Sequence, residues 1–202
     1  MIKKLIILLL SFFDFFHQRK IIKFLSKKNL TKIDILFDVG AHKGESINLF
    51  LSNMNVKKII SFEPSPTNFL RLKNIKEHYI KKFDKTEILI ENIGLGNEDK
   101  EINFKQFEES SSSTMKEIDE ESSYFKKKFN LLNYFSKEKK YKILKVKIIT
   151  LDDYMNLNKI NKISFLKIDT EGYEYEILKG LKKKIKLVDM IMFEHHYDNM
   201  II

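Results

Sequence analysis

From Ile33 onward, short apolar runs alternate with segments whose apolar residues recur at helical spacing. This alternation is typical of an open, mostly parallel sheet that has helices on both faces. The predicted strands are Ile33–Val39, Lys57–Phe62, Glu87–Ile93, Ser164–Ile168 and Val188–Phe193, and the predicted helices are Ser46–Asn53, Asn68–Tyr79, Leu151–Leu157 and Tyr173–Leu178. The sequence therefore predicts an α/β fold, whose ligands bind at the carboxyl ends of the strands.

A second pattern interrupts this alternation after the third predicted strand. Glu101–Phe107 and Leu144–Ile149 alternate apolar and polar residues, which predicts a pair of antiparallel strands. Residues 110–140 between them predict a serine-rich loop followed by an inserted helix. The chain has 202 residues, no internal repeat and no linker rich in proline or glycine, so we expect one domain over residues 31–202 after a helical segment over residues 1–30.

The first 30 residues contain two apolar stretches with basic flanks. Leu5–Leu10 follows two lysines, but it is far shorter than the about 20 residues that a spanning helix needs, and no small-x-small cleavage site follows it. The second stretch interleaves lysines with Ile21, Ile22, Phe24 and Leu25. We expect a helical pair packed on the domain of a cytoplasmic protein. A peripheral membrane helix and a cleaved signal are the alternatives.

The charge of the chain bears on its partners. The formal net charge is +9, nearly all of it carried by lysines spread along the chain, and Arg19 and Arg71 are the only arginines. Because arginine is the residue that grips bases and phosphates bidentately, we expect no nucleic-acid partner. The absence of cysteine excludes disulfides and cysteine-bound metals.

The first functional signal is the turn after the first predicted strand. Asp38 lies near the end of that strand, and Gly40 and Gly44 follow before a helix begins. Glycine at 40 permits a tight turn and a close ligand approach, and the N–H groups at the helix start suit an anionic group. Glu63 ends the next predicted strand beside Pro64, about 20 residues on, where a carboxylate can accept hydrogen bonds from both ribose hydroxyls. This arrangement predicts a nucleoside cofactor.

Polar residues follow three further predicted strands. Asn92 follows the third strand, where its amide could bond the adenine edge, and an ordinary turn explains it equally well. Asp169 and Glu171 follow the fourth strand, at the edge where ligands bind, although helix capping also explains acids there. Glu194 and His195 follow the last strand.

The order of these blocks resembles the FkbM family of methyltransferases. The blocks are FDVGAHKGES, SFEPSP, ENIGLG, VKIITLDDY, FLKIDTEGYEYEILKG and IMFEHH. The resemblance implies the class I methyltransferase (Rossmann-like) fold, S-adenosyl-L-methionine as cofactor and a hydroxyl acceptor, commonly on a sugar, a glycan or a secondary metabolite. It implies a serine-containing loop near the cofactor, at Ser111–Ser113. The implied cofactor-binding residues are Asp38, Gly40, Gly44, Glu63 and Asn92, to which we add Asp169 from its strand-end position.

The sequence departs from the family pattern after Glu194. A class I methyltransferase sheet ends with an antiparallel strand pair, and His195–Ile202 are too few residues to form it. We therefore expect a sheet that lacks this pair and exposes a strand edge. An exposed edge predicts self-association, which a monodisperse monomer in sedimentation would contradict.

Methyl transfer requires alignment of oxygen, carbon and sulfur, and a sugar hydroxyl needs a base to remove its proton. The predicted catalytic residues at the carboxyl edge are Glu171, Glu194 and His195, with His196 beside them. The two histidines have ordinary pKa values near neutrality, which suits this role. We expect no metal. The alternative is a divalent cation held by Asp169, Glu171 and Glu194.

Three other functions are compatible with parts of the pattern. A cofactor-binding module without catalysis is compatible with the missing strands, and a binding titration run beside a turnover assay separates it from an enzyme. A nicotinamide-dependent oxidoreductase would share the glycine turn and the acid, but the chain lacks G-x-G-x-x-G. An RNA methyltransferase would account for the net charge of +9.

Overall fold

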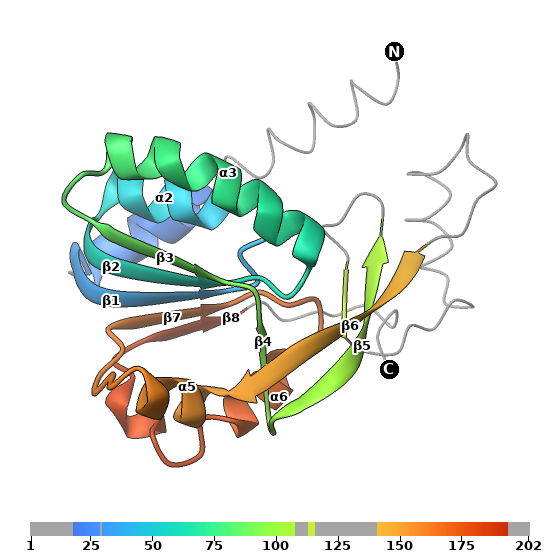
Figure 1. Ribbon diagram of the computed structural model, residues 1–202. Helices are drawn as coiled ribbons and strands as arrows, with labels where there is room; N and C mark the ends of the chain where they lie inside the picture. Colours follow the sequence, from blue (N-terminus) through green and yellow to red (C-terminus); the bar gives the residue numbers. More distant parts are fainter. Residues whose placement is uncertain (1–17, 29, 108–112, 116–140, 194–202) are drawn as a thin grey trace.

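The alternating apolar runs form a five-stranded parallel sheet, as the sequence predicts (Figure 1). The computed structural model describes residues 18–28, 30–107, 113–115 and 141–193. The strands are β1 (Lys32–Val39), β2 (Asn55–Phe62), β3 (Glu87–Glu91), β7 (Phe165–Ile168) and β8 (Ile191–Phe193), in the order β3-β2-β1-β7-β8. The strand order therefore reverses between β1 and β7, which is where open α/β sheets bind ligands.

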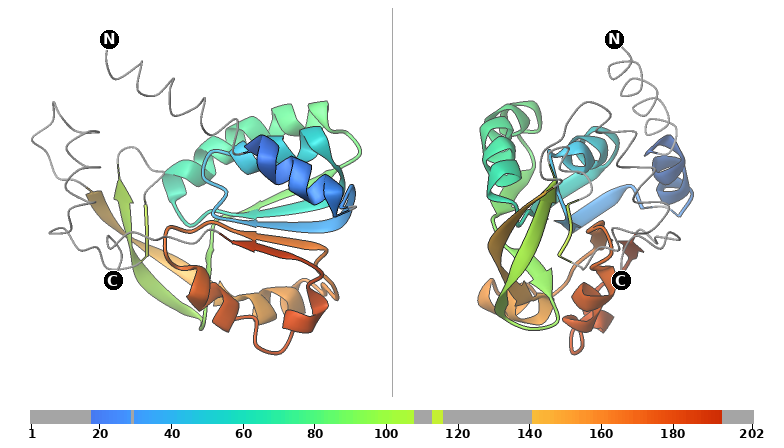
Figure 2. Two further views of the ribbon diagram at one scale, coloured as in Figure 1. Left: turned by 180° about the vertical axis from the view of Figure 1, so that it is seen from behind. Right: turned by 90° about the vertical axis from the view of Figure 1, so that its right-hand side faces the viewer.

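Helices cover both faces of this sheet (Figures 1 and 2). Helix 18–27, α2 (Glu45–Asn53) and α3 (Pro66–Lys82) lie on one face. The other face carries α5 (Leu151–Leu157), α6 (Glu174–Lys179) and the short helix η1 (Ile185–Leu187). Helix α3 begins where both local signals predict: the Ser65 hydroxyl accepts a hydrogen bond from the Asn68 amide at 3.2 Å, and Pro66 follows at the first helical position.

Each central strand supplies side chains to two separate hydrophobic clusters, because successive side chains on a strand point to opposite faces. Leu36, Ile59 and Phe165 belong to the cluster under helix 18–27, α2 and α3. The next residue in each strand, namely Phe37, Ile60 and Leu166, belongs to the cluster under α5 and α6. All six are at most 1% exposed, so the sheet is covered on both faces as a parallel sheet requires.

Helix 18–27 packs on the domain as the sequence predicts for the N-terminal segment. Its Leu25 is 2% exposed and joins the cluster under α2, and Ile21 and Ile22 pack against that cluster. The first apolar stretch, Leu5–Leu10, lies outside the described residues. Among the described helices, none has the length and apolar character needed to cross a membrane.

A smaller sheet stands beside the carboxyl edge of the main sheet (Figure 1). It contains β4 (Gly94–Gly96), β6 (Tyr141–Thr150) and β5 (Lys100–Phe107) in that order, and the predicted antiparallel pairing of β5 with β6 is confirmed. Gly94–Gly96 forms a short strand parallel to β6, which the sequence does not predict. The glycines permit this close pairing, since a Cβ on Gly94 would lie 2.7 Å from Ile148. The predicted inserted helix lies outside the described residues.

Two predicted strand boundaries need correction. The third strand ends at Glu91 instead of Ile93, and the last begins at Ile191, after a 3-10 turn, instead of Val188. Gly180 is the C-cap residue of α6, with a φ of −71°. Glycine is required there because a Cβ would lie 2.0 Å from the Gly96 carbonyl oxygen. The strand pair expected to be missing after β8 concerns residues 194–202, outside the described ones.

Candidate functional site

The carboxyl ends of β1, β2 and β7 surround a cavity of about 740 Å³. Its volume lies within the ~300–1,000 Å³ typical of small-molecule sites. Gly40 and His42 line it from the turn after β1, Glu63 lines it from the end of β2, and Asp169 and Glu171 line it from the loop after β7. The cavity therefore lies at the switch point of the sheet, where the sequence predicts the ligand site.

The turn after β1 is held in place by hydrogen bonds that its backbone amides donate. Gly40, His42 and Gly44 have φ values of 81°, 49° and 88°, so three of its five residues are left-handed. Every amide from Gly40 to Gly44 donates to a protein acceptor: Gly40 and Ala41 to the Phe62 carbonyl, His42 to Glu63, Lys43 to Glu45, and Gly44 to the Ala41 carbonyl. These five amides are therefore occupied by the protein itself, and an anionic ligand group would have to use N–H groups further into α2.

Gly40 is required for a reason that the sequence does not reveal. A Cβ at this position would lie 1.8 Å from the Asp169 carbonyl oxygen, closer than any non-bonded contact allows. The sequence predicts that glycine leaves room for a ligand, whereas here it leaves room for the backbone after β7. Gly40 thus joins the two halves of the sheet at the switch point.

Glu63 holds the loop after β2 to the turn after β1. Its Oε2 accepts from the His42 amide at 2.8 Å, and its Oε1 accepts from the Ser65 amide at 2.9 Å. The side chain is 4% exposed, and burial raises its pKa to about 7 although both amides oppose the shift. Glu63 is therefore a buried carboxylate at the cavity wall whose charge changes near neutral pH.

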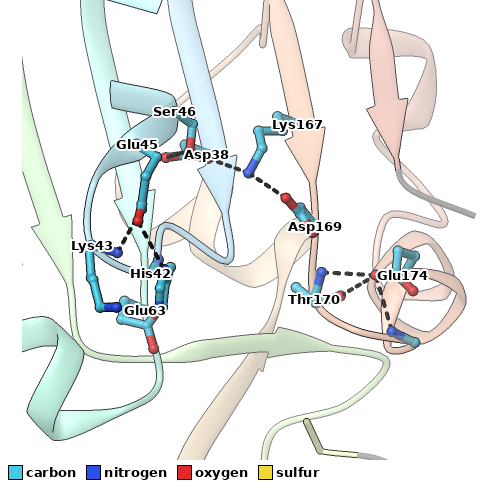
Figure 3. A network of polar contacts seen from close by, with 11 residues as sticks. Asp38, His42, Lys43, Glu45, Ser46, Glu63, Lys167, Asp169, Thr170 and Glu174 are labelled. Atoms are coloured by element: carbon cyan, nitrogen blue, oxygen red, sulfur yellow. Dashed lines mark hydrogen bonds and ion pairs between the residues drawn. The ribbon is translucent and has the colours of Figure 1, made fainter. Parts of the chain in front are cut away.

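A buried ion-pair network crosses from β1 to β7 (Figure 3). Lys167 Nζ lies 3.1 Å from Asp38 Oδ1 and 3.3 Å from Asp169 Oδ2, and the Ser46 hydroxyl donates to Asp38 Oδ2 at 3.0 Å. Asp38 is fully buried and Lys167 is 9% exposed. Burial alone would lower the pKa of Lys167, but the two carboxylates outweigh it and raise that pKa. Lys167 also lines the cavity, so the cavity wall carries a fixed positive charge.

The loop after β7 is shaped by a second buried acid. One oxygen of Glu174 accepts from the Thr170 amide at 2.8 Å, the Thr170 hydroxyl at 3.1 Å and the Gly172 amide at 3.3 Å (Figure 3). Glu174 therefore has a structural role in this loop. Within the loop, Glu171 has a φ of 53°, and its carbonyl accepts from the Thr114 hydroxyl at 2.7 Å. A strained non-glycine residue at a cavity wall is common at functional sites.

The structure brings together part of the predicted site. Of the predicted residues, Gly40, Glu63, Asp169 and Glu171 line the cavity. Asp38 is not part of the cavity lining but contacts two residues that are, Lys167 and Ser46. Gly44 lies against α3, where a Cβ would meet Leu72 at 3.1 Å. The Asn92 amide nitrogen donates to the carbonyls of Glu63 and Pro64 at 2.9 and 3.2 Å, outside the cavity lining. Glu194 and His195 lie outside the described residues.

Several cavity residues were not predicted from the sequence. Lys167 stands between apolar strand residues. A lysine inside a buried strand is itself a signal, because its charge requires a partner. Met115 also lines the cavity, two positions after Ser113, which is the one described residue of the predicted serine-containing loop and belongs to the lining too. Gln18 and Ile21 reach the cavity from helix 18–27, and no local pattern indicates that contact.

A divalent cation at Asp169, Glu171 and Glu194 was the alternative to a metal-free site. Within the described part of the chain, no group of three or more His, Asp or Glu residues could hold a metal ion. Glu194 lies outside that part, and Asp169 is ion-paired to Lys167.

An all-parallel main sheet with a cavity at its switch point defines a doubly wound α/β protein that binds its ligand at the carboxyl edge. The family model described as the methyltransferase FkbM domain matches residues 38–200. The chain therefore belongs to the FkbM methyltransferase-domain family, which confirms the resemblance of its sequence blocks.

Two individual proteins are similar to the chain. The hexuronic acid methyltransferase AglP of Haloferax volcanii is 25% identical over 163 residues, which cover 81% of this chain and 56% of that protein. The chain thus spans about half the length of this curated relative. A solved structure of the methyltransferase FkbM from Methylobacillus flagellatus KT is 17% identical with a TM-score of 0.47, over 74% of this chain and 29% of that one.

Proposed function

We propose that the protein is an S-adenosyl-L-methionine-dependent methyltransferase that transfers the methyl group to a hydroxyl of a sugar or glycan. The observation that carries the proposal is Glu63, a buried carboxylate at the carboxyl end of β2, beside a left-handed turn and inside a cavity of suitable volume. Membership of the FkbM family supports the reaction class, and the name of the Haloferax relative supports an acidic sugar as acceptor.

The residues around Glu63 are compatible with the nucleoside part of this cofactor. Each Glu63 oxygen already accepts one backbone amide and keeps a second lone pair, so the carboxylate can also accept the two ribose hydroxyls. Pro64, Ile93 and Leu95 provide apolar wall for the adenine ring. Asn92 supports this wall by holding the carbonyls of Glu63 and Pro64. When bound, the cofactor supplies an electrophilic methyl group on a sulfonium.

The β7 end of the cavity is assigned to the acceptor. Asp169 and Glu171 line this end, and Lys167 holds the Asp169 carboxylate through their ion pair. In this proposal Asp169 orients the acceptor hydroxyl, and a base taken from Glu171, Glu194 and His195 removes its proton as the new bond forms.

Calorimetry with S-adenosylhomocysteine, the demethylated product, tests the cofactor half of this proposal. We expect one binding site per chain, and a folded sample that gives no heat would refute the proposal. Turnover is then measured by mass spectrometry with isotope-labelled S-adenosylmethionine and a panel of uronic acids and neutral glycans, where the gain of one methyl group is expected. Binding without turnover on any acceptor would instead support a non-catalytic cofactor-binding module.

A further inference from the structure

The buried ammonium of Lys167 has more hydrogen-bond donors than the protein uses. An ammonium group carries three N–H groups. Among the described residues it has two acceptors, Asp38 Oδ1 at 3.1 Å and Asp169 Oδ2 at 3.3 Å (Figure 3). Because a buried charged donor without an acceptor is costly, the third N–H group favours a ligand that supplies an oxygen.

This donor lies where a ligand in the cavity can reach it. Lys167 is the next-to-last residue of β7, a strand that lies between β1 and β8 in a sheet covered on both faces. Its small exposed fraction, 9%, therefore faces the carboxyl edge, and Lys167 lines the cavity there. Asp169, to which the ammonium is paired, lines the same cavity with a side chain that is 40% exposed.

A second donor lies next to this ammonium. The Ser46 hydroxyl donates to Asp38 at 3.0 Å, so Ser46 and Lys167 contact the same carboxylate, and both line the cavity. Ser46 belongs to the first turn of α2, where amides have no acceptor within the helix, and Gly44 at the N-cap offers no side-chain acceptor. The Ser46 amide and the Lys167 ammonium together suit a carboxylate, which the dipole of α2 also favours.

The charges already present restrict which carboxylate fits. Lys167 contacts two carboxylates, and these would repel a third one that arrives as a simple anion, such as that of an acidic sugar. The amino acid end of S-adenosylmethionine is a zwitterion. It therefore brings a carboxylate to Lys167 together with an ammonium group, and it adds no net charge to the site.

The strand order agrees with this choice. The ribose is proposed to bind at Glu63, at the end of β2, and β1 lies between β2 and β7. Two strand spacings, about 10 Å, therefore separate the ribose site from the end of β7. The amino acid chain of the cofactor extends from the ribose and can cover this distance across the turn after β1.

We propose that Lys167 binds the α-carboxylate of the cofactor's methionine part, together with the amide of Ser46. This inference rests on the proposed function and deepens it, because it assigns the amino acid end of the cofactor to a lysine for which the sequence predicts no role. The buried ion pairs then also serve binding, since Asp38 and Asp169 hold the ammonium in place at the cavity wall.

The test is calorimetry on the full chain with two ligands that differ only in this carboxylate, S-adenosylhomocysteine and its decarboxylated analogue. We expect the unsubstituted protein to bind S-adenosylhomocysteine about 10- to 100-fold more tightly, the effect of one charge-assisted hydrogen bond, and Lys167→Met to lose this preference. The affinity for 5′-methylthioadenosine, which lacks the amino acid part, should stay the same. Lys58→Met is the matched control, since it loses an ion pair with Glu87 outside the cavity lining and should keep the preference.

The double variant Asp38→Asn with Lys167→Met, which removes both charges, is measured in the same way in case the single variant does not fold. Equal affinity of the unsubstituted protein for the two ligands would overturn the assignment, and so would a preference that survives in the Lys167 variants. Glucuronic acid is titrated onto the complex with S-adenosylhomocysteine, and weaker binding of this acid alone in Lys167→Met would assign the lysine to the acceptor instead. Failure of the proposed function would appear separately, as a folded chain that binds none of the nucleosides.

Discussion

The two ends of the cavity are built in different ways. At the β1–β2 end, His42 and Glu63 are 21 positions apart and belong to one strand-turn-helix-strand unit. At the β7 end, the Thr114 hydroxyl donates to the carbonyl of Glu171, 57 positions along the chain. The first end is therefore a local motif, whereas the second depends on the whole fold.

The buried carboxylates of Glu63 and Asp38 are also neutralised differently. Two backbone amides donate hydrogen bonds to Glu63, and burial raises its pKa to about 7, so its charge responds to pH. Asp38 instead forms an ion pair with the Lys167 ammonium and accepts a hydrogen bond from the Ser46 hydroxyl, so its neutralisation is fixed. This difference indicates an adjustable charge where the cofactor is proposed to bind and a permanent scaffold between the two ends. Five predictions test that contrast, from the largest expected effect to the smallest.

Gly40→Ala should prevent folding, because the new Cβ would collide with the Asp169 carbonyl in a left-handed backbone. We expect a loss in the free energy of unfolding of about 5 kcal/mol or more, measured by urea denaturation with circular dichroism. Gly44→Ala is the control, since its φ of 88° gives the same strain but its nearest atoms are side chains at 3.1–3.4 Å. Equal losses would show that the contact between the two halves is unimportant.

Lys167→Met should destabilise the protein by about 3 kcal/mol, because it leaves the Asp38 carboxylate buried without its cation. The double variant Asp38→Asn with Lys167→Met should recover part of this loss, since it removes both charges. Denaturation of the two single variants and the double variant measures this coupling. Lys58→Met on β2 loses only a surface pair with Glu87 and should cost less than about 1 kcal/mol. Strictly additive losses would contradict a buried ion pair.

Glu63→Gln should weaken binding of S-adenosylhomocysteine about 10- to 100-fold, the effect of losing charge-assisted hydrogen bonds to ribose. In the unsubstituted protein, affinity should rise as pH increases through about 7, because the carboxylate must ionise to accept both hydroxyls. The Gln variant should lack this dependence. Calorimetry across that pH range is the measurement, and identical pH profiles for the two proteins would contradict the assignment.

The same raised pKa sets the sign of a stability change in the ligand-free protein. The Glu63 pKa is 4.5 in the unfolded chain and about 7 in the fold, so the unfolded state releases its proton first as pH rises. Stability should therefore fall between these values relative to Glu63→Gln, by at most about 3 kcal/mol. A constant difference between the two proteins over this pH window would show that Glu63 is not buried as described.

The contrast between the two ends also explains what the sequence could predict. Gly40 and Glu63 could be predicted because a strand, a turn and a helix in direct succession bring them to the carboxyl edge of the sheet. This placement does not depend on distant parts of the chain. Asp38 and Asn92 were found at the right strand ends, but their side chains turn to Lys167 and to backbone carbonyls, which spacing along the chain does not reveal. Gln18 and Thr114 could not be found, because their positions depend on packing between distant segments.

Thr114→Val should produce the smallest change and should affect only the β7 end. It removes the hydroxyl that donates to the Glu171 carbonyl while keeping the side-chain volume, so we expect a loss of about 1 kcal/mol in the free energy of unfolding. Thr86→Val is a matched control, since its hydroxyl donates to the Val56 carbonyl at 2.8 Å, away from the cavity. The two variants should lose similar stability, but only Thr114→Val should raise the KM for the acceptor, because Glu171 is then less firmly held. An unchanged acceptor KM, or a change in the affinity for S-adenosylhomocysteine instead, would show that the loop after β7 does not serve the acceptor and that the two ends of the cavity are not separate in function.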